Sequence, residues 1–219
     1  MKFPRLAWLI PIALCLVGCV TPQIKDAEPE TINWKQQQLL LSKIKQWSIN
    51  GRIAVQTATE GGQADYSWQQ LNATDYTIRL QAPLGAGTTW IKGRAQGVKL
   101  QTSSGDSLFD TDVDKLMLQV NSWPLPVSGL RFWVLGLPSS ATAYSVSEWQ
   151  DNGLPRVMLQ DGWRIEFRQY KKEAGMLVPH KLFIRRLDAN ERAAGGLDDN
   201  ENGEVDVRLI IRQWSIGNV

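Results

Sequence analysis

The sequence predicts a mainly β protein of the α+β class, with one antiparallel sheet of about ten or eleven strands and about three helices. Most segments after residue 48 alternate apolar and polar residues with a period of two, so each strand has one face toward a core and one toward water. Turn-forming pairs such as Asn152-Gly153 and Asp161-Gly162 separate several of these segments. Because strands of a parallel sheet buried on both faces would be apolar throughout, the alternation favours an antiparallel sheet.

The predicted strands form two groups, one on each side of a helical stretch. They occupy residues 49–56, 64–69, 76–81, 88–92, 98–101, 107–109, 144–150, 156–160, 163–170, 178–187 and 205–214. Turns are expected at Gly61-Gly62, at 72–75 and at Gly105-Asp106. Residues 189–203 include a run of acidic side chains and are predicted to form a long solvated loop.

A first helix is expected over 34–47, with its cap at Asn33 or Thr31. Four apolar residues recur there at helical spacing. They are Leu40, Leu41, Ile44 and Trp47.

The period changes to that of a helix again in the middle of the chain. One helix is predicted over 113–120 behind Thr111 or Asp112, and a second short one over 126–135 that ends at Gly136. A long sheet with one apolar face must curl and be covered, and these three helices are the available cover. The enclosed space holds either an ordinary core or an apolar cavity, and the pattern alone favours the core.

Composition excludes several classes of function. Lys+Arg 24 against Asp+Glu 22 leaves no basic excess for a nucleic acid partner. The chain has a single His, and its two Cys both lie before residue 20. These residues are too few for a metal site or a Cys/His nucleophile pair. Ten Trp exceed Phe and Tyr together, and indole rings favour the walls of apolar pockets and polar boundaries.

The first residues are similar to the secretory signal of a bacterial lipoprotein. A basic start precedes an apolar run over 6–17, and Leu16-Val17-Gly18-Cys19 resembles the lipobox, which implies acylation of Cys19. The expected organisation is a signal peptide over 1–18, a lipidated N-terminus and tether over 19–32, and one folded domain over 33–219. The alternative is an ordinary leader ending near a cysteine, which would leave an unpaired thiol in an oxidising compartment.

Three further motifs carry a resemblance to a known family. They are Pro83-Leu84-Gly85, the segment 130–138 (Leu-Arg-Phe-Trp-Val-Leu-Gly-Leu-Pro) and Ala141-Thr142-Ala143-Tyr144. With the lipobox and the strand order, they are similar to the LolB family of outer-membrane lipoprotein receptors. The similarity runs in outline from Trp34 to Trp214 and departs from the family in the acidic loop.

The resemblance implies a fold and a task. The fold is an incomplete antiparallel β-barrel with a helical lid over a hydrophobic cavity. The task, for a monomer anchored in the outer membrane and facing the periplasm, is to accept acylated lipoproteins from a LolA-like carrier. The lipoproteins then pass into the outer-membrane lipids without an energy source, and Val20, in place of Asp, implies this outer-membrane location. No cofactor or metal is expected, and Gly85-Ala86-Gly87 lacks the rest of a nucleotide-binding pattern.

Inward strand phase and helical stripes select nine candidate cavity or lid positions, each of which could equally be core. They are Tyr66, Trp68, Ile78, Leu80, Trp90, Leu116, Met117, Leu130 and Trp133. The resemblance assigns Leu84, between Pro83 and Gly85, to a protruding loop that enters the bilayer. The alternative for Leu84 is a side chain tucked under the end of a strand.

Two other functions stay open at the level of sequence. An enzyme would need His180 as a base, but no Gly-x-Ser-x-Gly segment or tight acidic pair accompanies it, so no catalytic residue is expected. An envelope scaffold lipoprotein would bind a protein or glycan partner through its Trp residues.

Overall fold

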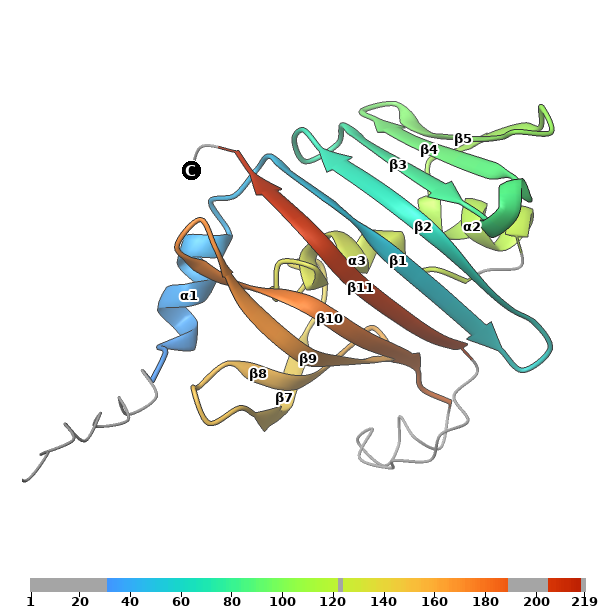
Figure 1. Ribbon diagram of the computed structural model, residues 1–219. Helices are drawn as coiled ribbons and strands as arrows, with labels where there is room; N and C mark the ends of the chain where they lie inside the picture. Colours follow the sequence, from blue (N-terminus) through green and yellow to red (C-terminus); the bar gives the residue numbers. More distant parts are fainter. Residues whose placement is uncertain (1–30, 122–123, 189–204, 218–219) are drawn as a thin grey trace, which may run out of the picture. The chain divides into compact units, whose positions relative to one another are not determined.

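Within the described residues, eleven antiparallel strands form one open sheet with the order β6-β5-β4-β3-β2-β1-β11-β10-β9-β8-β7 (Figure 1). The computed structural model describes residues 31–121, 124–188 and 205–217. The strands are β1 (Trp47–Thr57), β2 (Gly61–Gln70), β3 (Tyr76–Gln81), β4 (Thr88–Arg94), β5 (Gly97–Thr102), β6 (Ser107–Asp110), β7 (Tyr144–Trp149), β8 (Pro155–Gln160), β9 (Trp163–Glu173), β10 (Met176–Arg186) and β11 (Val205–Ile216). β6 and β7 are the two edges, so the sheet does not close into a barrel. The predicted fold class is confirmed.

The period-two pattern works as expected in the strands. In β2, Ala64, Tyr66, Trp68 and Gln70 are buried while the residues between them are exposed. β3 has the predicted bounds, 76–81, and most other strands extend a few residues beyond the predicted ones. Because alternate residues of a strand point to opposite faces, this alternation alone predicts the apolar inner face.

The turn predicted at Gly61-Gly62 is wrong. Both glycines belong to β2, where they pair with Gln56 and Val55 of β1. The turn lies just before them because the Thr57 hydroxyl accepts a hydrogen bond from the Glu60 amide at 3.0 Å and donates one to the Glu60 carbonyl at 3.0 Å. A local threonine turn thus closes the hairpin and leaves the glycines in the strand.

The first helix is shorter than predicted. α1 spans Trp34–Leu41, and Asn33 caps it by accepting a hydrogen bond from the Gln36 amide at 3.1 Å. The prediction of a helix to residue 47 is wrong because Trp47 starts β1, where it pairs with Gln70 of β2. Strand pairing of a buried indole overrides the helical spacing. Leu40, which the helical stripe placed inward, is exposed.

Two helices cover the inner face of the sheet. α2 (Val113–Asn121) follows the edge strand β6, and α3 (Val127–Trp133) precedes the other edge strand, β7. Asp112 caps α2 by accepting hydrogen bonds from the amides of Asp114 and Lys115. Gly136 adopts a left-handed φ of 74° just after α3, as a helix stop requires. The connection between the two sheet edges therefore forms the cover, which we call the α2–α3 cover (Figure 1).

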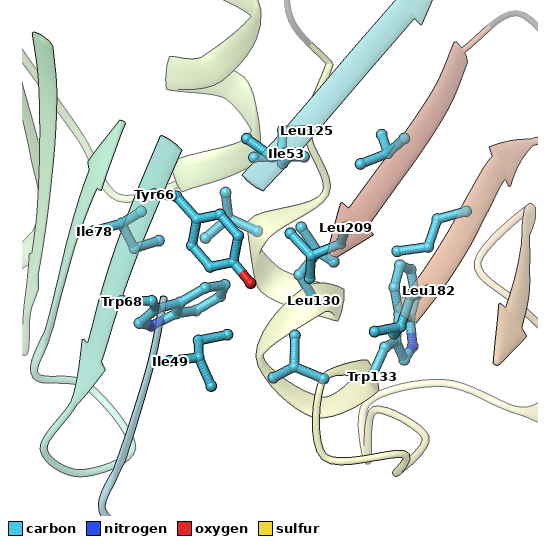
Figure 2. Packing of buried hydrophobic residues seen from close by; sticks show 14 of the residues in the cluster. Ile49, Ile53, Tyr66, Trp68, Ile78, Leu125, Leu130, Trp133, Leu182 and Leu209 are labelled. Carbon is cyan, nitrogen blue, oxygen red and sulfur yellow. The ribbon is translucent and has the colours of Figure 1, made fainter. Parts of the chain in front are cut away.

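Apolar side chains of the sheet and the cover pack into one core (Figure 2). Trp68 lies between Trp47 and Tyr76, with ring centroids 5.3 Å and 6.2 Å away. Gly93 of β4 makes room for the Tyr76 ring, since a Cβ at Gly93 would lie 2.1 Å from it. A larger residue at position 93 would push this ring out of the core.

Gln160 is the polar anchor of the segment that follows α3. It is buried and accepts hydrogen bonds from Trp133 Nε1 at 3.0 Å and from the Ser139 amide at 2.8 Å. Its Nε2 donates to the carbonyls of Ser139 and Thr142 at 2.9 Å and 3.1 Å. One side chain of β8 therefore fixes the end of the cover to the sheet.

We expect Gln160→Leu to lower the free energy of unfolding by about 2–5 kcal/mol, because it leaves two buried N–H groups without an acceptor. Chemical denaturation followed by Trp fluorescence measures the change. Gln81→Leu, at an exposed position of β3, is the matched control and should have almost no effect. Equal stability of the Gln160→Leu variant and the wild type would show that this anchor contributes nothing.

Candidate functional site

Eight of the nine candidate cavity positions lie together on the inner side of the sheet. β2 and β3 supply Tyr66, Trp68, Ile78 and Leu80, and the cover supplies Leu116, Met117, Leu130 and Trp133. All eight are buried members of one core cluster. In Figure 2, the side chains of Tyr66 and Trp68 point from the sheet toward Leu130 on α3. The space between sheet and cover is thus filled by the side chains predicted to line it.

The inward placement of Trp90 is wrong. Ile91 is buried and pairs with Ile78 and Leu100, so it occupies the inner phase of β4. Trp90 therefore points to the opposite, outer face, where it pairs with Arg79 and is only partly buried. The inward strand phase predicted for Trp90 is off by one residue, because the pleat of β4 turns Ile91 to the inner face.

Tyr66 places a hydroxyl in the apolar interior. Among the described residues this hydroxyl has no hydrogen-bond partner, and burial raises the pKa of Tyr66. Leaving a buried polar group unpaired costs about 1–3 kcal/mol. The hydroxyl is therefore able to donate to an oxygen of a bound molecule without breaking an existing bond.

Open hollows adjoin the packed interior at both ends. A groove of about 730 Å³ lies between α1, the start of β1 and the segment from α3 to β7, and we call it the α1 groove. Its apolar lining includes Leu39, Leu41, Ile44, Trp47, Phe132 and Leu135. A second hollow of about 690 Å³ lies between the β1–β2 turn and the α2–α3 connection, next to Leu125 and Trp163. The α1 groove has the size of common ligand sites, roughly 300–1,000 Å³.

Few polar contacts fasten the cover to the N-terminal half of the sheet. Arg131 of α3 donates from Nη1 to the carbonyl of Ala73, in the β2–β3 turn, at 2.8 Å. Within the cover, Asp114 accepts hydrogen bonds from the Ser128 amide at 3.0 Å and from the Ser128 hydroxyl, which joins α2 to α3. Burial raises the pKa of Asp114, while these bonds oppose the rise. Apolar contact therefore supplies most of the attachment on this side.

Leu84 lies on an exposed loop, so the alternative of a tucked side chain is wrong. Its relative exposure is 106%, and it adopts a left-handed φ of 54° that a branched apolar residue rarely takes. Pro83 precedes it, and Gly85 follows with a φ of 76°. Leu84 thus neither packs in the core nor relaxes the backbone, and the fold alone gives no reason for it.

Leu84 and the α1 groove lie at opposite ends of the sheet. Tyr76, at the start of β3, pairs with Gln70, which pairs with Trp47 beside the groove. β3 then runs to Gln81 at the other end, where the Leu84 loop begins. The structure therefore does not bring the candidate insertion loop and this groove together.

His180 has a structural environment. It is buried in β10, where the pairing with β9 shifts register. Its Nδ1 lies 3.1 Å from the carbonyl of Ile211, and its Nε2 lies 3.0 Å from Oε1 of Glu173. Both ring nitrogens thus face protein groups rather than an open pocket.

The described residues contain neither a metal-binding cluster nor a membrane-spanning helix. Within 31–121, 124–188 and 205–217, no three or more His, Cys, Asp or Glu side chains gather as a metal site would require. None of the helices in these ranges is long and apolar enough to cross a membrane. The predicted signal peptide, Cys19, most of the tether and the acidic loop lie outside the described residues.

Comparison with known proteins gives a consistent result over nearly the whole chain. The family model for outer membrane lipoprotein LolB matches residues 45–214. The outer-membrane lipoprotein LolB of Alkalilimnicola ehrlichii is 30% identical over 204 residues, covering 93% of each chain. That of Nitrosococcus oceani is 27% identical over 219 residues, covering 99% of this chain and 100% of the relative. A LolA superfamily structure from Nitrosomonas europaea superposes with a TM-score of 0.46 at 7% identity, over 86% of this chain and 96% of that one. On the family match and these relatives, the chain belongs to the LolB family of outer-membrane lipoproteins.

Proposed function

We propose that this outer-membrane lipoprotein accepts lipoproteins from a LolA-like periplasmic carrier and inserts them into the outer membrane. The acyl chains of the cargo occupy the space between the sheet and the α2–α3 cover. The observation that carries this proposal is the continuous apolar inner face, covered by two short helices and flanked by open hollows. Exposing one long acyl chain to water costs on the order of 10 kcal/mol, at about 0.8 kcal/mol per methylene, so a protected route is needed.

Entry of an acyl chain requires the cover to shift, because side chains fill the interior. The free-energy cost of the shift is small, since an acyl chain replaces the apolar contacts that Leu116, Leu130 and Trp133 make with the sheet. Gln160 holds the far end of the cover, whereas Arg131 makes one hydrogen bond to the β2–β3 turn. We therefore place the opening on the Arg131 side, along the β2–β3 turn.

The transfer needs no energy source in this mechanism. The carrier, this protein and the bilayer bind the same chains with increasing affinity, and the cargo moves down that gradient. In our proposal, Cys19 carries the lipid anchor after removal of residues 1–18, and the tether over 19–32 lets the folded domain reach both carrier and membrane. The protein acts as a monomer.

Leu84 is proposed to enter the bilayer during release. An exposed leucine held in a left-handed conformation adds nothing to stability, but it offers an apolar tip to a lipid surface. Its distance from the α1 groove means that release involves the other end of the sheet.

The central test combines binding and transfer. We expect the mature chain with Cys19→Ala, which stays in solution, to bind a fluorescent fatty-acyl probe saturably and to quench its own Trp emission on binding. Mixed with a cargo-loaded carrier, it should take over the lipoprotein. If binding is absent and the cargo stays on the carrier, the transfer function is wrong and an envelope scaffold is the better description.

For Leu84, we expect Leu84→Glu to leave thermal stability and cargo acceptance unchanged but to slow delivery into liposomes by about tenfold or more, because a carboxylate resists entry into the bilayer. Leu84→Met keeps an apolar tip and is the matched control, with delivery near the wild-type rate. Delivery by Leu84→Glu at the wild-type rate would refute this role.

A further inference from the structure

A small pocket beside the cover combines apolar walls with two arginines. It has a volume of about 250 Å³ and lies between the β2–β3 turn, the β4–β5 turn and the two helices of the cover. We call it the mouth pocket. Its lining includes Trp68, Tyr76, Val98, Val113 and Val127, together with Arg94 and Arg131. All five apolar wall residues come from the sheet or the cover and belong to the core cluster, so the pocket adjoins the interior.

Both arginines use only part of their hydrogen-bonding capacity. Arg94 Nη1 donates to the carbonyl of Gly93 at 2.6 Å and lies 3.5 Å from that of Tyr76. Arg131 Nη1 donates to the carbonyl of Ala73. A guanidinium has five N–H donors, and across the described part of the chain neither arginine forms an ion pair with a carboxylate. Neither guanidinium is therefore paired with a carboxylate among these residues, and Arg94 is exposed while Arg131 is half-buried.

Carboxylates on the flanking segments are engaged elsewhere. Asp110 pairs with Lys115 at 3.4 Å, Asp114 bonds to Ser128, and Asp75 of the β2–β3 turn accepts hydrogen bonds from Asn72 and Thr74. Asp112 caps α2. None of these side chains lines the mouth pocket. The pocket is therefore cationic at its polar end and apolar at its other walls.

We propose that Arg94 and Arg131 bind the anionic headgroup of a lipid, a carboxylate or a phosphate, whose chain enters the interior. The proposal rests on the proposed function, since the chain needs the space under the cover. It adds a second ligand class, because acyl chains attached to a protein through ester or amide links are neutral at that end. Guanidinium groups form strong, paired hydrogen bonds with such oxyanions.

The size of the pocket fits a headgroup and not a whole lipid. A volume of 250 Å³ is below the roughly 300–1,000 Å³ of common ligand sites. The headgroup and first methylenes fill it, and the rest of the chain passes Trp68 into the interior. The Tyr76 wall does not repel the anion, because burial, together with the charge of Asp114, raises the pKa of Tyr76 to about 12 and keeps the phenol neutral.

A pair of probes that differ only in the headgroup tests the proposal. They are a fluorescent long-chain fatty acid and its methyl ester, titrated into the mature chain with Cys19→Ala. We expect the acid to bind more tightly than the ester, and Arg94→Gln to weaken binding of the acid about tenfold while binding of the ester is unchanged. Raising the salt concentration should weaken binding of the acid alone.

Two further variants keep the test interpretable. Arg94→Lys retains the charge and should restore part of the affinity for the acid. Arg79→Gln removes an exposed arginine from the outer face of β3 and should change neither affinity. A single-chain lysophosphatidate should compete with the acid, whereas inorganic phosphate at the same concentration should not, because it lacks the chain.

The outcomes separate this inference from the proposed function. If the wild type binds neither probe, the acyl-chain function fails. If the wild type binds both equally and Arg94→Gln changes nothing, the headgroup assignment is wrong while the acyl-chain function stands. Displacement of the acid by inorganic phosphate at equal concentration would show a site for free anions and would also overturn the lipid assignment.

Discussion

The structure depends on one constraint: an open sheet of eleven strands has an apolar inner face that must be covered. Within the described residues, the chain meets it with the connection between the two sheet edges, which runs from β6 through α2 and α3 to β7. A closed barrel would cover its own interior by strand pairing. Here the cover is held by apolar side chains instead, and apolar contacts can be exchanged for those of another apolar molecule.

This exchange links stability to function. Gln160 fixes one end of the cover with several hydrogen bonds, while Arg131 makes one at the opposite side. In the proposed function, such an arrangement keeps the cover in place when the protein is empty and lets it tilt when acyl chains arrive. The arginine that holds the cover also lines the mouth pocket, and its other N–H donors are left for a bound headgroup.

Local patterns predicted much of this fold, because strand alternation is a short-range signal. β3 has the predicted bounds, and the buried positions of β2 follow from its period. Features set by distant residues were missed. Trp90 faces outward because Ile91 holds the inner phase, and the first helix ends early because Trp47 pairs in the sheet. Arg94 and Arg131 gave no signal in the sequence. For Gln160, whose partners lie in other elements, the one available hint was a lone glutamine in a buried strand phase.

Photocrosslinking of a bound acyl chain tests whether the chain lies between the sheet and the α2–α3 cover. A lipoprotein with a diazirine on one acyl chain is transferred to the protein, irradiated, and mapped by mass spectrometry. We expect labels on inner-face residues of both layers, such as Trp68 of β2 and Leu130 of α3. Labels confined to outward side chains such as Trp90, with the inner face unlabelled, would contradict this expectation.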